Sequence, residues 1–201
     1  MVYKNKDNLS LSSISNNEQY LLLSERLTTS ENKFYLFDII KGEKKEISTA
    51  PGSYSAAGFS NDNKGFYFIT DVGKEFTYLN KYDIKTSEST VVFETNWDVM
   101  YSYSSKNEKY RIIGINEDGK NSIQVIDSNS NKPIEFPSFE NADITGVSFS
   151  ESEQKIRLSV GSSKMPNDLF VYDMETKSLV KLTNSLNKEI DPKSLVKAEV
   201  V

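Results

Sequence analysis

The 201-residue sequence contains no cysteine and no histidine. The absence of cysteine excludes disulfides, thiolate metal ligands and thiol nucleophiles, and it suits a reducing compartment. The absence of histidine excludes Ser-His-Asp and Cys-His catalytic arrangements and imidazole zinc sites. No Gly-x-Ser-x-Gly elbow, phosphate-binding glycine loop or dinucleotide fingerprint is present either. We therefore expect no catalytic residue, no metal site and no cofactor in this chain.

Long apolar runs and basic clusters are also missing. No stretch approaches the roughly 18 apolar residues of a membrane-spanning helix, and residues 1–7 lack the apolar core of a signal peptide. The net charge of −5, without a lysine or arginine cluster, disfavours nucleic-acid binding, because neutralising phosphates requires a concentrated basic surface. The sequence predicts a soluble protein, favours the cytoplasm, and predicts neither nucleic acid nor membrane as a partner.

What the sequence does contain is a fourfold repeat with a period of about 45 residues. In each copy an aspartate follows an apolar and aromatic run, at Asp38, Asp83, Asp127 and Asp173. A serine recurs at similar spacing, and we assign it to Ser15, Ser60, Ser104 and Ser150. Repeats of this length, built from short alternating strands, are typical of β-propeller blades.

Each repeat has four runs of alternating apolar and polar residues, separated by turn-forming residues. In the second repeat the runs are 55–60, 65–71, 78–84 and 89–94. The second run is the most apolar in every repeat, which predicts a strand buried between neighbouring sheets. The sequence therefore predicts an all-β fold, a β-propeller with four visible blades of four antiparallel strands.

The predicted propeller occupies residues 1–184, with blades at about 9–49, 53–95, 97–138 and 142–184. Residues 185–201 read as an exit segment without a fifth blade. If the four blades belong to a larger ring, they leave two open faces of apolar sheet, and such faces normally find a partner. We expect the chain to self-associate or to need further blades. A homodimer that completes an eight-bladed ring is the simplest closed arrangement, and a tight four-bladed ring is the alternative.

Residues 59–71 and 82–86 resemble the "FSPDGK-x-hYF-x-SD … YDLKTG" pattern of bacterial propeller repeats. Three further stretches narrow the match: 96–99, 116–119, and the run from 182–185 through 195–201. Together they resemble the N-terminal propeller of the prolyl oligopeptidase family of serine peptidases, of the dipeptidyl or acylaminoacyl peptidase type. In that family an "LT-N-S" strand and an "LV-x-x-E-x-V" run lead directly into an α/β-hydrolase catalytic domain.

The resemblance implies a function. The family's propeller covers the active site and limits substrates to short peptides. By this resemblance the chain is a non-catalytic propeller that gates peptide access to a hydrolase domain absent from the chain, in a parent serine peptidase. Because family propellers have seven or eight blades, we expect only the C-terminal blades here. The alternatives are a stand-alone protein–protein interaction module and, with less support, a hydrolase that uses carboxylates.

Several residues have both a functional and a structural interpretation. The four repeated aspartates could form a metal ring, but turn-capping carboxylates are favoured. Residues 116–119 resemble a calcium loop but lack its ligand series, so a hairpin turn with Gly119 at positive φ is favoured. Trp97 could stack on a ligand, but packing between blades is favoured.

The only arginines are Arg26, Arg111 and Arg157. We place Arg111 and Arg157 at equivalent positions of second strands, with Lys64 near the corresponding place in the second repeat. An arginine there could hold a peptide carboxylate. A solvated or blade-bridging side chain is favoured.

Overall fold

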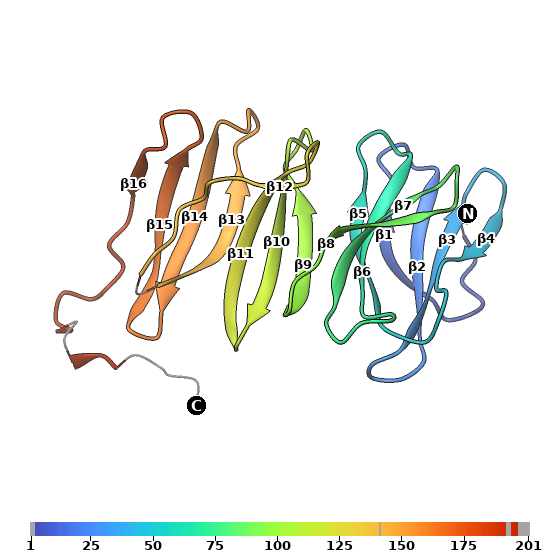
Figure 1. The fold of residues 1–201 in the computed structure, drawn as a ribbon, viewed down its shortest axis with the longest axis horizontal. Coiled ribbons are helices and arrows are strands. Elements are labelled where there is room, and N and C mark those ends of the chain that lie inside the picture. The colour runs from blue at the N-terminus through green and yellow to red at the C-terminus, as the bar shows by residue number, and fades with distance from the viewer. Residues whose placement is uncertain (1–2, 141, 192–193, 197–201) are drawn as a thin grey trace. The chain divides into compact units, whose positions relative to one another are not determined.

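The computed structural model describes residues 3–140, 142–191 and 194–196, and over these residues the regular elements are sixteen β-strands. The strands form four sheets of four (Figure 1). The first sheet comprises β1 (Ser10–Ile14), β2 (Tyr20–Arg26), β3 (Asn32–Asp38) and β4 (Glu43–Glu46). The second comprises β5 (Tyr54–Phe59), β6 (Gly65–Thr70), β7 (Tyr78–Asp83) and β8 (Ser89–Phe93). The third comprises β9 (Asp98–Ser104), β10 (Tyr110–Glu117), β11 (Lys120–Asp127) and β12 (Lys132–Pro133). The fourth comprises β13 (Asp143–Phe149), β14 (Lys155–Ser162), β15 (Met165–Asp173) and β16 (Leu179–Lys181).

Within each sheet the strands lie side by side in chain order. In the second sheet, for example, β6 pairs antiparallel with both β5 and β7, and β7 pairs antiparallel with β8. These four strands lie within one residue of the four predicted runs at every end. The prediction of an all-β fold built from four-stranded antiparallel propeller blades is confirmed.

The chain divides into two compact units, residues 1–103 and 104–201. The core of the first unit lies between its first two sheets and is mostly aromatic. It contains Phe34, Phe66, Phe68, Tyr54 and Tyr82, and the rings of Phe66 and Tyr82 stack with centroids 4.9 Å apart. Bulky rings fill the space between two twisted sheets with few side chains, and each buries a large apolar area.

The core of the second unit lies between the third and fourth sheets and is mostly aliphatic. Ile112, Val125, Ile156 and Leu158 are fully buried there. In both units the second strand of each sheet is among the most buried, as the apolar runs predicted. All six residues of β6 are buried, as expected for a strand that is apolar along its whole length.

The outer face of the first sheet, which points away from the second sheet, is covered by residues 3–9. Leu21, Leu23, Tyr35 and Phe37 on this face are only 2–7% exposed. Tyr3 and Leu9 pack against them, with the rings of Tyr3 and Phe37 4.8 Å apart. An ion pair of 2.6 Å between Lys44 and Asp7 also joins this segment to the sheet.

The prediction of two open apolar faces is therefore wrong for the first sheet, because a segment outside the repeats supplies the missing apolar partners. The outward face of the fourth sheet is mixed. There Ile156 and Leu158 point into the core, so the alternate residues Arg157 and Ser159 point outward. Their cross-strand neighbours on that face are the apolar Val171 and Leu169 of β15. Over the described residues, no helix is long and apolar enough to cross a membrane.

Candidate functional site

The repeated aspartates cap turns at the ends of the third strands. Asp38 accepts hydrogen bonds from the backbone N–H groups of Ile40 and Lys41 at 3.0 and 3.1 Å. Asp83, Asp127 and Asp173 do the same for the residues two and three positions later. The structural interpretation is confirmed. Among the described residues, no group of three or more acidic side chains could hold a metal ion.

Hydrogen bonds lower the pKa of three of these carboxyls. The backbone N–H of Thr86 is the main cause for Asp83, and that of Ser130 for Asp127. For Asp173 the main cause is Lys155, whose ammonium lies 2.7 Å from the carboxylate. All three therefore stay ionised and keep accepting the turn hydrogen bonds under mildly acidic conditions.

The repeated serines hold the turn between the first and second strands. Each hydroxyl accepts the backbone N–H of the first residue of the second strand, at 2.9–3.1 Å; the serines are Ser15, Ser60, Ser105 and Ser150. The assignment of Ser104 is therefore wrong, because Ser105 makes the equivalent bond. Ser104 instead accepts a hydrogen bond from the Arg111 guanidinium.

The error has a physical origin in the third repeat. One residue fewer separates Ser105 from Asp127 than separates serine from aspartate in the other repeats. In the hairpin between β10 and β11, Glu117 pairs with Lys120 across a two-residue turn and the ladder has no register shift. The hairpin between β14 and β15 also has a two-residue turn, but a register shift between Val160 and Ser162 accompanies its extra residue. Asp118 and Gly119 have φ of 52° and 72°, as a type I′ turn requires. The hairpin interpretation of residues 116–119 is thus confirmed.

The serine turns also join neighbouring blades within each unit. The N–H of Asn17 donates to Asn63 Oδ1 at 3.2 Å in the first unit. The N–H of Asn107 donates to Glu153 Oε1 at 2.8 Å in the second. Asn63 and Glu153 occupy the same turn position and both have positive φ, at 56° and 58°. The serine turns at this end of the blades therefore hold the two sheets of each unit together.

Glu153 is the one acidic residue in these bonds, and it is only 5% exposed. Burial alone would raise its pKa, but hydrogen bonds from the Ser105 hydroxyl and the Asn107 N–H outweigh burial and lower the pKa. A carboxyl with a lowered folded-state pKa contributes stability above its unfolded pKa of about 4.3, and this stability is lost as the pH falls through the folded value.

We expect Glu153→Gln to lower the free energy of unfolding at neutral pH by about 1 kcal/mol, because the amide oxygen is a weaker acceptor than the carboxylate. The variant should also lose part of the wild-type decline in stability below about pH 4. Thermal unfolding followed from pH 7 to pH 3 measures both effects. Glu151→Gln is the control, because Glu151 is 80% exposed in its ion pair with Lys106 and should change stability little. Equal pH profiles for Glu153→Gln and wild type would contradict the prediction.

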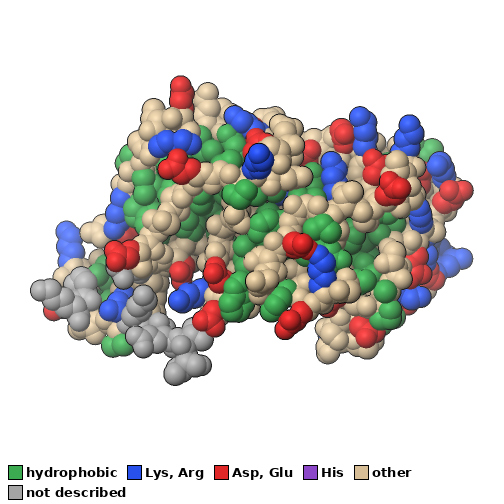
Figure 2. All heavy atoms as spheres, in the orientation of Figure 1, with side chains coloured by type: hydrophobic (Ala, Val, Ile, Leu, Met, Phe, Trp, Pro, Cys, Tyr) green, Lys and Arg blue, Asp and Glu red, His purple; other side chains and the backbone are tan. Residues whose placement is uncertain are grey.

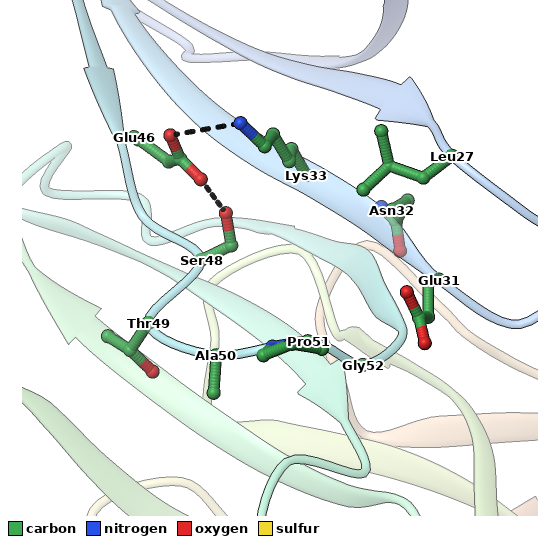
Figure 3. A pocket seen from close by; sticks show the side chains of 10 residues that line it. All are labelled: Leu27, Glu31, Asn32, Lys33, Glu46, Ser48, Thr49, Ala50, Pro51 and Gly52. Carbon is green, nitrogen blue, oxygen red and sulfur yellow. Dashed lines mark hydrogen bonds and ion pairs between the residues drawn. The ribbon is translucent and has the colours of Figure 1, made fainter.

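A cavity of about 240 Å³ lies at the opposite end of the first sheet (Figure 3). Lys33 lies 3.8 Å from Glu46, and the Ser48 hydroxyl donates to the same carboxylate at 2.8 Å. The Ser48 oxygen also accepts the N–H of Phe34. Lysine, acid and hydroxyl thus form a polar triad beside the loop 48–52.

The fourth sheet carries the same triad with the charges exchanged. Asp168 takes the position of Lys33, Lys181 that of Glu46, and Thr183 that of Ser48, counted from Asp173 and Asp38. Asp168 and Lys181 lie 2.7 Å apart, and the Thr183 hydroxyl donates to Asp168 at 2.9 Å.

The N–H of Ser185 also donates to Asp168. The ammonium of Lys181 is the largest cause that holds the pKa of Asp168 well below its usual range. The carboxylate is 1% exposed and fully hydrogen-bonded, so it anchors residues 183–185 rather than offering a catalytic group.

A second cavity, of about 470 Å³, lies beside this triad. Apolar and charged side chains both line it: Phe139, Met165 and Leu186, with Glu140, Lys164, Asp168 and Lys181. Sequence reasoning missed both triads and both cavities. Lys33 and Asp168 each lie five residues before the repeated aspartate, so the sequence places them at equivalent positions of their repeats. Only the structure shows that each forms an ion pair, with Glu46 and Lys181 respectively.

The arginine prediction is wrong in one respect. Arg111 lies one position earlier than Arg157 relative to the serine of its own repeat, so the two are not equivalent and point to opposite faces. Arg111 is 2% exposed and Arg157 is exposed. Burial keeps Arg111 from a peptide carboxylate in solvent. Lys64 is exposed and pairs with Asp62 at 3.7 Å.

Arg26 and Trp97, which also had a possible functional interpretation, lie at the surface. The Nε–H of Arg26 donates to the backbone oxygen of Thr28. Trp97 is 36% exposed and lies between β8 and β9, with its ring 6.3 Å from that of Phe76. It packs beside one aromatic neighbour and leaves about a third of its surface accessible.

Four-stranded antiparallel sheets with repeated serine and aspartate turns define the chain as part of a β-propeller. The family model described as "Prolyl oligopeptidase, N-terminal beta-propeller domain" matches residues 1–185. The chain belongs to the prolyl oligopeptidase family through this domain. A comparison with curated protein sequences gave no match.

Solved structures show the same fold at low sequence identity. A prolyl oligopeptidase B from Galerina marginata, bound to a 35mer hydrolysis and macrocyclization substrate, matches with a TM-score of 0.75 and 15% identity, over 96% of this chain and 29% of that chain. A puromycin-hydrolyzing peptidase from Mycobacterium tuberculosis matches with a TM-score of 0.72 and 10% identity, over 98% of this chain and 32% of that one. TolB from Acinetobacter baumannii matches with a TM-score of 0.60 and 16% identity, over 86% of this chain and 43% of that one. The chain therefore spans less than half the length of each of these three proteins.

Proposed function

We propose that this propeller controls the access of peptides to an α/β-hydrolase domain in a serine peptidase of the prolyl oligopeptidase family. The observation that carries the proposal is the family match over residues 1–185. The higher TM-scores with the two peptidases than with TolB agree with it. The propeller cannot itself supply a Ser-His-Asp triad, because the chain has no histidine.

The physical basis of such gating is steric. A rigid β-scaffold beside an active site admits short, extended peptides and excludes folded or long chains. The structure offers rigid sheets joined by the Asn17–Asn63 and Asn107–Glu153 hydrogen bonds within each unit. A stand-alone interaction module is the alternative function, and it needs no hydrolase domain.

The purified chain should hydrolyse neither aminoacyl nor peptidyl chromogenic substrates, and a fluorophosphonate probe should not label it. In a protein where the propeller is joined to its hydrolase domain, short chromogenic peptides should be cleaved and casein should not. Removing the propeller should reduce this discrimination by tenfold or more, because an open active site no longer selects by size. Fluorophosphonate-sensitive turnover by the chain alone, or equal size selection without the propeller, would overturn the proposal.

A further inference from the structure

A third cavity, of about 560 Å³, lies in the second sheet, between the hairpin that joins β6 to β7 and the segment that follows β8. It is lined by residues 74–76, Tyr78 and residues 94–96. This cavity is larger than those of the first and fourth sheets. Its volume lies within the range of about 300–1,000 Å³ that is usual for small-molecule sites.

The wall of this cavity is aromatic where the other two sheets carry a charged residue. Tyr78 stands at the repeat position that Lys33 and Asp168 occupy in their triads. Phe76 also lines the cavity. Beside it, the ring of Trp97, which is 36% exposed, lies 6.3 Å from that of Phe76. Aromatic ring faces attract cations.

The lining also carries an excess of negative charge, because Glu75 and Glu94 face a single lysine, Lys74. Figure 2 shows basic and acidic side chains interspersed over the visible face, so charge selects a ligand only locally. Among the described residues, the cavity of the fourth sheet balances two acids with two lysines, and that of the first sheet has no aromatic lining. The cavity of the second sheet thus joins aromatic rings to negative charge, and both favour a cation.

The cavity already holds a cation of its own. The Nζ atom of Lys74 lies 4.3 Å from the centroid of the Tyr78 ring and forms an ion pair with Glu94. The side chains of Lys74 and Glu94 are 38% and 56% exposed, and ion pairs with this exposure contribute little to stability. A ligand cation can therefore take the place of the Lys74 ammonium at low cost.

The shape of the cavity does not depend on Lys74. The N–H of Thr77 donates to Asp98 Oδ1 at 2.9 Å, which ties the β6–β7 hairpin to the start of β9. The Tyr78 hydroxyl donates to the carbonyl of Val72 at 2.9 Å, which holds the tyrosine ring against the same hairpin. Both hydrogen bonds remain when Lys74 moves away, so the walls are preformed for a ligand.

We propose that this cavity binds a quaternary ammonium group, such as that of choline, in place of the Lys74 ammonium. The methyl groups pack against the rings of Phe76 and Tyr78, and the carboxylates of Glu75 and Glu94 supply the opposite charge. A primary ammonium is compact and strongly hydrated, so it loses more on leaving water than a methylated one does. Aromatic faces are the usual recognition element for quaternary ammonium ligands. The inference does not depend on the proposed role in a peptidase.

The test is a titration of wild type and Lys74→Met with choline, followed by the fluorescence of Trp97, the only tryptophan in the sequence, and by isothermal titration calorimetry. Methionine removes the internal competitor, so we expect choline to bind Lys74→Met about three- to tenfold more tightly than wild type. Lys74→Arg is the matched control, because arginine keeps a cation over the ring and should not raise the affinity.

Two matched ligands separate the contributions of the methyl groups and the charge. Ethanolamine lacks the methyl groups of choline, and the uncharged tert-butyl analogue of choline has carbon in place of nitrogen. Each should bind Lys74→Met at least about tenfold more weakly than choline does. Co-sedimentation with phosphatidylcholine vesicles distinguishes a lipid headgroup, which would carry the protein down with the vesicles, from a free ligand, which would not.

Variants of the walls, made in the Lys74→Met protein, test the site itself. Glu94→Gln should weaken choline binding more than Glu88→Gln, because Glu88 is exposed in the turn at the other end of β7 and β8, and the difference should shrink at high salt. Tyr78→Leu should weaken binding more than Tyr78→Phe, which keeps the ring face. Circular dichroism checks that each variant is folded.

Three results would each overturn the proposal. The first is the absence of choline binding by Lys74→Met. The second is binding of ethanolamine or the uncharged analogue as tightly as choline. The third is the same choline affinity for Lys74→Met and Lys74→Arg, which would show that choline does not compete with the internal cation.

Discussion

Replacing Phe66 with alanine is expected to lower the free energy of unfolding of the first unit by about 3–5 kcal/mol. The Phe66 ring is fully buried, and its centroid lies 4.9 Å from that of Tyr82 and 6.0 Å from that of Phe34. Alanine would remove the ring from the centre of the aromatic cluster and leave a cavity that the paired strands β6 and β7 cannot close. A small domain has about 5–15 kcal/mol of total stability, so the loss would be a large part of it.

Urea denaturation measures this effect. Trp97 is the only tryptophan in the sequence and lies in the same unit as Phe66, so its fluorescence reports the unfolding of that unit. Phe66→Leu is the control, because it keeps most of the apolar volume and should cost much less than alanine. A midpoint for Phe66→Ala within error of the wild-type value would contradict the predicted position of Phe66 at the centre of the core.

Replacing Gly65 with alanine is expected to lower the free energy of unfolding by about 1–3 kcal/mol, although the change adds only one methyl group. A Cβ atom at Gly65 would lie 2.3 Å from the carbonyl oxygen of Tyr82. That oxygen belongs to the backbone of β7, which pairs with β6 through Gly65 and Asp83, so it cannot move without disturbing the ladder. The cost arises from this close approach, because the φ of Gly65 is not positive.

Gly146→Ala is the matched control for Gly65→Ala. A Cβ atom at Gly146 would have the Ser159 Cβ as its nearest neighbour, at 3.5 Å, which is an ordinary contact. Gly146 also lies in a strand and has no positive φ, so both changes alter the unfolded chain in the same way. Chemical denaturation of the two variants should therefore separate them by at least 1 kcal/mol or so. Similar stabilities would show that β7 yields to the added methyl group.

The sequence predicts the strands well because their signals are local. Alternating apolar and polar residues place all four strands of the second sheet within one residue of their positions, and the hairpin at Asp118-Gly119 follows from turn chemistry. The assignment of the repeated serine to Ser104 is wrong because Ser104 and Ser105 are adjacent and both fit the approximate repeat spacing. Only the hydrogen bond from the Tyr110 N–H to the Ser105 hydroxyl identifies the equivalent serine.

Features that depend on distant contacts could not be predicted from the sequence. Residues 3–9 carry no repeat signal, yet Tyr3 and Leu9 cover the outer face of the first sheet. The burial of Arg111, at a position where the fourth sheet has Ile156, is another example. The sequence around Asp168 gives no sign that its carboxylate is buried. Its burial and its pairing with Lys181 depend on the return of β16 alongside β15.

The exchange of charge between the two triads has a consequence for folding. Repeats of similar sequence can pair with the wrong partner strand, and such misassembly is a characteristic failure of repeat proteins. If β3 paired with β16, Lys33 would lie beside Lys181, and if β15 paired with β4, Asp168 would lie beside Glu46. Like charges at neighbouring positions of two strands are destabilising, whereas the native pairings join Lys33 to Glu46 and Asp168 to Lys181. The reversed ion pairs therefore disfavour these two wrong strand pairings relative to the native ones.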